Sequence, residues 1–150
     1  MNELRVPTVA LPAEILNAEG QVLRGRIFVP AAASHHEGPT RPEEWINDPH
    51  WFFPFLPDDG TGPFLLNKEQ LVVVTVAYER MEEHGELERA VRIECAGRTL
   101  EGNLHIEMPT NQQRVLDYLN QPPSFVALYA GDRVHLVHKR HVTRLTESRS

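Results

Sequence analysis

The chain has 150 residues, a formal net charge of −6, 41% hydrophobic residues and 24% charged residues. This length allows one ordinary domain or two very small ones. The acidic balance argues against a general nucleic-acid or membrane-surface binder, because such proteins usually carry a clear basic excess. The imbalance is uneven: residues 1–80 hold 11 acidic and 6 basic residues, and residues 81–150 hold 10 and 9. An anionic partner would therefore prefer the second half.

The first motif in chain order predicts the second of two strands that open the chain. Residues 20–30 form a glycine turn followed by alternating apolar and polar residues, which indicates a strand with one buried face. The apolar positions on that face are Leu23, Ile27 and Val29. Gly25 lies inside the strand, where a glycine usually marks a bulge or a sharp bend. We therefore expect a bent strand of the kind that lets a short sheet curl.

A short helix follows, over residues 41–49. Its acidic residues Glu43 and Glu44 complement the dipole of a helix start, and the proline at its end stops the helix. Asn47 is expected to cap the C-terminal end. The polar segments 31–40 and 57–63, on either side of this region, are expected at the surface.

An aromatic run comes next and is too apolar to be fully solvated. We expect Phe52 and Phe55 to fill the interior. Trp51 and Phe53 would then face outward, toward the other half of the chain or toward a partner. Together with Trp45, these two outward aromatics are the candidate protein-interface residues.

The second half repeats these motifs in the same order. The matching segments are 20–30 with 97–109, 41–49 with 114–122, Phe52 with Phe125, and 65–71 with 136–142. Four motifs in one order predict an internal duplication, with domains at residues 1–84 and 85–150. In this alignment Asn120 takes the place of Asn47, as a second helix cap. Each repeat would contain two strands, a short helix and three strands, which makes the fold class mainly β with a small α component.

The acidic segment 81–88 would link the two repeats. Domains of about 70 residues bury too little apolar surface to be very stable alone. We therefore expect the repeats to pack against each other or to oligomerise.

Residues 91–104 predict a strand, a glycine turn and a bent strand. Residues 137–145 predict an apolar strand, a lysine-containing turn and a short apolar strand. In this the second repeat resembles an Sm-like domain, the small bent β-barrel of the Sm proteins and of the bacterial host-factor RNA chaperone. The resemblance implies two pseudo-symmetric Sm/SH3-like bent β-barrel repeats. The helix between the second and third strands departs from the family, which usually has a short loop there. The helix-bearing repeat is also similar to small bacterial domains of unassigned function.

The resemblance also implies an RNA- or DNA-binding site at the lysine-containing turn. The candidate residues are Lys139, Arg140, His141 and Arg144 in the second repeat and Lys68 in the first. In the chaperone a histidine directly follows the lysine, whereas Arg140 intervenes here. The first repeat places Glu69, an acidic residue, directly after Lys68. Nucleic-acid binding is therefore one candidate function of this chain.

The sequence offers little evidence for metal binding or catalysis. On a strand His135 and His141 can share a face while His138 points away, and no metal-binding motif surrounds them, so we predict no metal or other cofactor. No nucleophile elbow, phosphate loop or dinucleotide motif occurs, and we expect no enzymatic activity. The single cysteine, Cys95, lies in an apolar stretch and is expected to be a buried thiol.

The leading hypothesis is therefore a non-enzymatic interaction or assembly module, with a protein partner or a second copy of itself. Nucleic-acid binding is the first alternative, and a small ligand or metal held between the repeats is the second. We see no secretory leader and no apolar stretch of 18 residues. These features predict a soluble cytoplasmic protein without a membrane partner.

Overall fold

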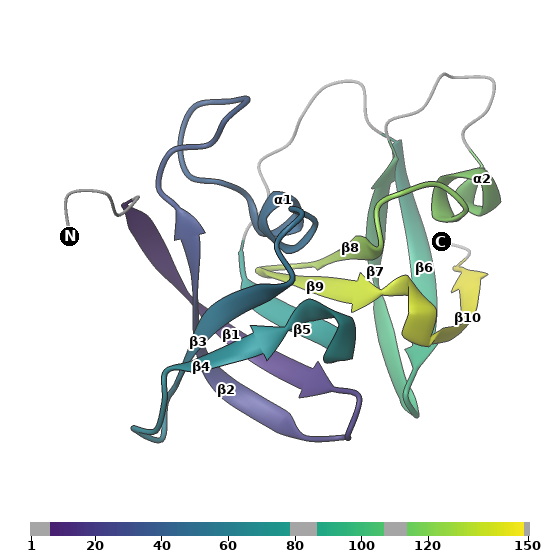
Figure 1. Ribbon diagram of the computed structural model, residues 1–150. Coiled ribbons are helices and arrows are strands. Elements are labelled where there is room, and N and C mark those ends of the chain that lie inside the picture. Colours follow the sequence, from purple (N-terminus) through teal and green to yellow (C-terminus); the bar gives the residue numbers. More distant parts are fainter. Residues whose placement is uncertain (1–6, 79–86, 107–113, 149–150) are drawn as a thin grey trace.

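The computed structural model describes residues 7–78, 87–106 and 114–148, which form ten strands and two short helices (Figure 1). The first half contains β1 (Thr8–Asn17), β2 (Val22–Pro30), α1 (Pro42–Ile46), β3 (Phe52–Pro57), β4 (Phe64–Asn67), the one-turn 3-10 helix η2 (Lys68–Gln70) and β5 (Leu71–Ala77). The second half contains β6 (Leu87–Cys95), β7 (Arg98–Ile106), α2 (Val115–Leu119), β8 (Phe125–Ala130), β9 (Arg133–His138), η4 (Lys139–His141) and β10 (Val142–Glu147).

The mainly β class is confirmed, and both halves have the same order of elements. Each runs strand, strand, helix, strand, strand, 3-10 turn, strand, which is the expected order with the turn added. Asn47 and Asn120 are the C-cap residues of α1 and α2, as expected. The predicted domain boundary after residue 84 lies outside the described residues.

All ten strands belong to one antiparallel sheet with the order β10-β6-β7-β8-β9-β5-β1-β2-β3-β4. The first half contributes β5-β1-β2-β3-β4 and the second half contributes β10-β6-β7-β8-β9, so corresponding strands follow the same order. The two halves meet where β5 pairs with β9, from Val73 opposite Val137 to Ala77 opposite Arg133. We call this contact the joint. Strands β4 and β10 form the two ends of the sheet.

The described strands form an open sheet, whereas the sequence predicted two separate bent barrels. In the first half, β5 pairs with β1 and with β9, which leaves β4 at one end. In the second half, β9 pairs with β8 and β5, and β10 pairs only with β6. The edges of β5 and β9 that would be needed to close each half on itself are instead used to join the halves.

The glycines predicted to bend the second strand of each half mark a close approach of the neighbouring strand. A Cβ atom on Gly25 would lie 2.2 Å from the carbonyl oxygen of Leu56, and a Cβ atom on Gly102 would lie 2.6 Å from that of Tyr129. Any side chain would collide with these carbonyls, so only glycine allows the two strands to come so close. Leu56 and Tyr129 occupy matching positions in the two halves.

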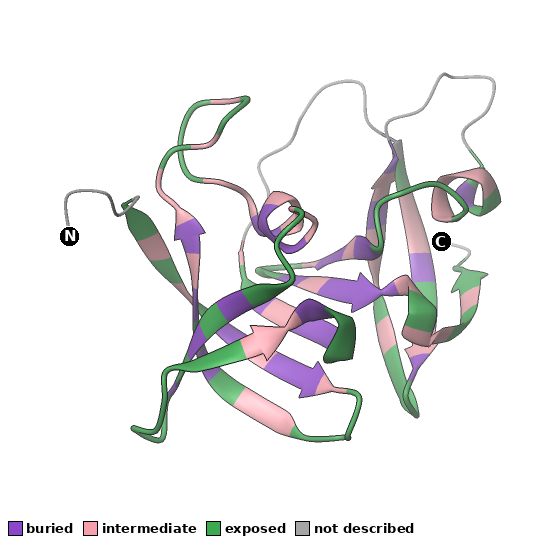
Figure 2. Ribbon diagram, viewed as in Figure 1, coloured by how far each residue is buried: buried purple, intermediate pink, exposed green. Residues whose placement is uncertain are grey.

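The hydrophobic core is shared across the joint. The core cluster of the first half includes four residues of the second, Phe125, Tyr129, Val134 and Leu136. The cluster of the second half includes three residues of the first, Leu16, Val72 and Val73. Buried residues concentrate in β5, β8 and β9, whereas the outermost strands are exposed or half-buried (Figure 2). The two halves therefore stabilise each other by burying apolar surface at the joint.

Two further expectations concern single features. Cys95 is fully buried, as expected, and desolvation raises the pKa of its thiol. Among the described residues, no helix is both long enough and apolar enough to cross a membrane.

Candidate functional site at the joint and the sheet edges

The side chain of Asn47 fastens the two halves together. Its Nδ2 donates to the carbonyl oxygen of Phe125 at 3.1 Å, and its Oδ1 accepts from the backbone N–H of Phe125 at 3.1 Å. The same Nδ2 also donates to the carbonyl oxygen of Glu43 at 2.9 Å, which is the capping contact within the first half. One amide thus ends α1 and holds the start of β8. We call the pair of bonds to Phe125 the amide clamp.

Polar contacts also cross the joint away from the clamp. Arg140 forms an ion pair with Glu69 at 3.2 Å, which connects η4 of the second half to η2 of the first. Thr75 and His135 lie opposite each other in the paired strands, and the Thr75 hydroxyl and His135 Nδ1 are 2.8 Å apart. The joint therefore combines strand pairing, a shared core and specific polar contacts.

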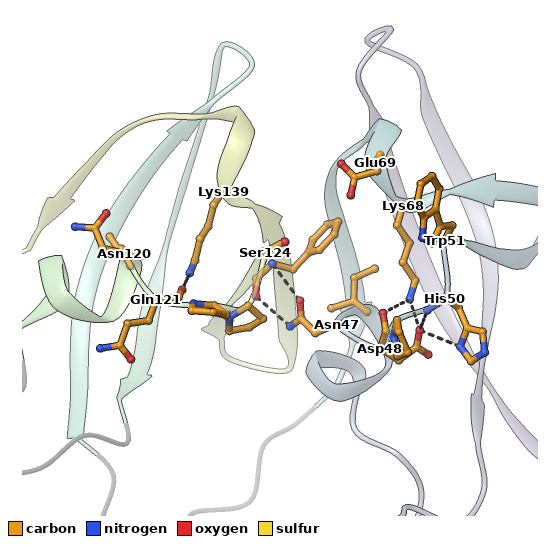
Figure 3. A pocket seen from close by; sticks show the side chains of 16 residues that line it. Asn47, Asp48, His50, Trp51, Lys68, Glu69, Asn120, Gln121, Ser124 and Lys139 are labelled. Carbon is orange, nitrogen blue, oxygen red and sulfur yellow. Dashed lines mark hydrogen bonds and ion pairs between the residues drawn. The ribbon is translucent and has the colours of Figure 1, made fainter.

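A cleft of about 670 Å³ opens between the halves beside the clamp (Figure 3). It is lined by the segments that follow α1 and α2 and by the two lysine-containing turns. Asp48 and Glu69 contribute negative charges, and Lys68 and Lys139 contribute positive charges. Asp48 is paired with Lys68, and Glu69 is paired with Arg140. Lys139 is the lining residue whose charge is left without a carboxylate among the described residues.

Lys68, a candidate for nucleic-acid binding, is part of the structure of the first half. It is 5% exposed. Its ammonium group donates to Asp48 Oδ1 at 2.6 Å and to the carbonyl oxygens of Trp45 and Asp48, both at 3.3 Å. Burial alone would raise the pKa of Asp48, but the hydrogen bonds from Lys68 and His50 hold that pKa below its usual value. Lys68 thus presents no free charge to a ligand.

The four candidates of the second half lie close together in the chain but have different surroundings. Lys139 donates to the carbonyl oxygen of Gln121 at 2.6 Å, and burial lowers its pKa. Arg140 is paired across the joint, and Arg144 is paired with Glu94. His141 Nε2 is buried without a hydrogen-bond partner among the described residues. Of these candidates, only Lys139 lines the cleft.

The expected orientation of the aromatic run was wrong for two residues. Phe53 is 4% exposed and Phe52 is 53% exposed, the reverse of the expectation. Successive side chains of β3 point to opposite faces, and the inward face carries Phe53 and Phe55. Trp45 is also buried, in an edge-to-face contact with Phe53 whose ring centroids are 4.8 Å apart. Of the three interface candidates, only Trp51 is exposed, at 71%.

Five of the six exposed large apolar side chains among the described residues lie at the β4 end of the sheet. They lie on β3, on β4 and just before β3: Trp51, Phe52, Leu56, Phe64 and Leu65. Of the exposed large apolar side chains described, only Leu116, on α2, lies elsewhere. An apolar, unpaired strand edge is a ready template for pairing with another strand. The β4 end is therefore a candidate interface.

The histidines of the second half are not arranged as a metal site. No group of three or more histidine, cysteine, aspartate or glutamate side chains that could hold a metal occurs within the described residues. His138 is 3% exposed, stacks on Phe125 with ring centroids 4.6 Å apart, and has a buried Nδ1 with no hydrogen-bond partner among those residues. Desolvation lowers the pKa of His138. Burial at the joint thus disfavours the charged form of this imidazole.

The amide clamp is the feature that the sequence did not reveal. Asn47 was predicted only as a helix cap, and capping explained its position after the helix. The one available signal was that both repeats keep an asparagine at this place.

Comparison with known protein families, with curated proteins and with solved structures found no match.

Proposed function

We propose that this protein is a non-enzymatic assembly module, built from two copies of one small Sm-like unit, which joins head to tail with further copies of itself. The observation that carries the proposal is the joint. There β5, the last strand of the first half, pairs with β9, the fourth strand of the second half. The strands at the two ends of the sheet are β4, the fourth strand of the first half, and β10, the last strand of the second half. A second copy can therefore add β10 to β4 in the way that β5 adds to β9.

The two fourth strands differ in burial in the way that this proposal requires. Leu136 of β9 is fully buried at the joint, whereas its counterpart Leu65 of β4 is 71% exposed. Val137 of β9 is also fully buried, and its counterpart Leu66 is half-buried. The β4 end thus carries apolar side chains suited to an interface but has no strand paired on its outer side within the described chain.

Several observations support the duplication on which the proposal rests. The two halves share the order of elements and the order of strands in the sheet. Gly25 and Gly102 make the same close approach to matching carbonyls. The backbone N–H of Lys68 donates to the carbonyl of Trp51 at 2.8 Å, and that of Lys139 donates to the carbonyl of Ser124 at 2.9 Å. The matching residues of the sequence alignment therefore make matching contacts.

Head-to-tail addition uses two different surfaces, so it produces a closed ring or an open filament. Strand β10 presents polar residues where β5 presents valines, for example Arg144 in place of Val73. We therefore expect association between copies to be weaker than the internal joint and to depend on protein concentration.

Sedimentation velocity over a range of protein concentrations tests the proposal. We expect the wild type to form species larger than the monomer as its concentration rises, and Leu65→Lys to remain monomeric. Ala10→Lys is the matched control, because Ala10 is exposed but lies on β1, a strand inside the sheet and not at either end. A wild type that stays monomeric at every concentration, or a control that dissociates as readily as Leu65→Lys, would contradict the proposal.

The cleft supports a second candidate function, the binding of an anionic ligand such as a single-stranded nucleic acid. The supporting observation is Lys139, which lies in a cleft of ligand size and has no carboxylate partner within the described part of the chain. Fluorescence anisotropy with short single strands at several salt concentrations tests it. Binding that weakens with salt and is lost in Lys139→Ala would support this candidate, since phosphate contacts must show a salt dependence. Native mass spectrometry would show any small ligand held between the halves.

A further inference from the structure

The amide clamp has an unoccupied counterpart in the second half. Asn120 is the C-cap of α2, as Asn47 is the C-cap of α1. The Asn120 side chain is exposed, and its amide makes no hydrogen bond within the described residues. In Figure 3 both amides point the same way: Asn47 points toward the second half, and Asn120 points away from the first. Asn120 therefore faces the side on which a following copy would lie.

The backbone that Asn47 holds also has a counterpart. Phe125 lies opposite His138 in β8 and β9, and Phe52 lies opposite Asn67 in β3 and β4. In both ladders the preceding residue accepts the hydrogen bond from the lysine of the turn, Ser124 from Lys139 and Trp51 from Lys68. In an antiparallel ladder, hydrogen-bonded and non-hydrogen-bonded pairs alternate. The pairs Phe125–His138 and Phe52–Asn67 are therefore non-hydrogen-bonded, and the N–H and C=O groups of the two phenylalanines face away from the partner strand.

Those outward groups of Phe125 are held by Asn47, whereas those of Phe52 have no hydrogen-bond partner among the described residues. Strand β2 pairs only with Leu56 and Pro57, at the far end of β3. The side chains show the same difference, since Phe125 is 4% exposed and Phe52 is 53% exposed. Phe52 thus has the position of Phe125 without the cover that the adjoining half provides.

We propose that Asn120 clamps the backbone of Phe52 in a second copy of this chain, with Nδ2 donating to the carbonyl and Oδ1 accepting from the N–H. The clamp rests on the proposed head-to-tail assembly and supplies its specific contact. It places α2 of one copy beside the start of β3 of the next, and it buries Phe52 as Phe125 is buried at the joint.

The charges beside the clamp agree with this arrangement. At the joint, Glu69 of the first half meets Arg140 of the second. In the next contact along the assembly the roles of the halves are exchanged, so Arg140 of one copy faces Glu69 of the following copy. The turn η2 carries Glu69 and the turn η4 carries Arg140, so opposite charges meet both at the joint and between copies. Repulsion between like charges, which would occur if both turns were basic, does not arise.

The experiment compares Asn120→Ala with Gln121→Ala in sedimentation velocity. Gln121 is the exposed neighbour of Asn120 and its side chain is not part of the proposed clamp. Loss of two hydrogen bonds is expected to weaken self-association by roughly ten- to thirtyfold in Asn120→Ala and to leave Gln121→Ala like the wild type. Hydrogen exchange at the Phe52 amide is the second readout. We expect protection that grows with concentration in the wild type and is lost in Asn120→Ala.

The outcomes separate the clamp from the assembly. A wild type that associates, with Asn120→Ala associating equally and the Phe52 amide unprotected, would overturn the clamp and leave the head-to-tail assembly standing. A wild type that never associates would overturn both. Unfolding of Asn120→Ala at low concentration checks that the monomer keeps its stability, so that weaker association cannot arise from a damaged fold.

Discussion

The amide clamp predicts unequal costs for the same substitution at two matching positions. Asn47→Ala removes three hydrogen bonds, to Glu43 and twice to Phe125. At about 1 kcal/mol net for each bond, the loss is about 3 kcal/mol. Because a domain is stable by only about 5–15 kcal/mol, this loss is large. The bond to Glu43 accounts for about a third of it, and the rest comes from the joint.

Urea unfolding, followed by the fluorescence of the tryptophans at a concentration where the chain is monomeric, measures this difference. We expect Asn47→Ala to lower the urea midpoint and to lower Tm by about 6–12 °C. Asn120→Ala, which removes no described hydrogen bond, is expected to change the free energy of unfolding by less than about 0.5 kcal/mol. Equal losses at the two positions would contradict the clamp, because they would show that the contacts of Asn47 with the second half contribute nothing.

Two further predictions concern buried ionisable groups. Lys68→Met removes the donor to two carbonyls and one of the donors to Asp48, which keeps its hydrogen bond from the backbone N–H of His50. We expect it to cost about 2–4 kcal/mol in urea unfolding, whereas Lys139→Met, which loses one bond to Gln121, should cost less than about 1 kcal/mol. Similar losses would contradict the structural role of Lys68. Because desolvation lowers the pKa of His138 below the 6.5 of the unfolded chain, the unfolded state binds protons first, and stability should fall as the pH drops through that value. The titratable and charged groups near His138 are Glu69, Arg140 and His141. Between pH 7.5 and 5.5, the free energy of unfolding should fall less in His138→Gln than in the wild type. An equal fall in both proteins would exclude His138 as its source.

The local elements could be predicted because each has a local cause. The helix of each half is marked by its proline and asparagine, and the turn glycines and alternating strands have their own patterns. The order of elements in each half therefore follows from the sequence, and the match between the halves shows that the order is repeated.

The contacts between distant segments could not be predicted in the same way. Pairing of β5 with β9 depends on which edges remain free after each half has folded, and no local pattern records this. The aromatic run is apolar at nearly every position, so alternation could not decide whether Phe52 or Phe53 points inward. Lys68 looked like an exposed cation because its partner, Asp48, lies 20 residues earlier in the chain.

Cysteine cross-linking between copies tests the head-to-tail assembly most directly. At the joint Val74 lies opposite Leu136, and the matching residues at the sheet ends are Leu145 of β10 and Leu65 of β4. Chains carrying Leu65→Cys are mixed with tagged chains carrying Leu145→Cys under mild oxidation. Buried Cys95 is not expected to compete. Chains carrying Thr146→Cys are the control, because a shift of one residue turns the side chain to the other face of the sheet.

Head-to-tail assembly predicts a disulfide-linked heterodimer for Leu65→Cys with Leu145→Cys and much less with Thr146→Cys. Absence of that heterodimer, or equal yields from both mixtures, would contradict the head-to-tail assembly.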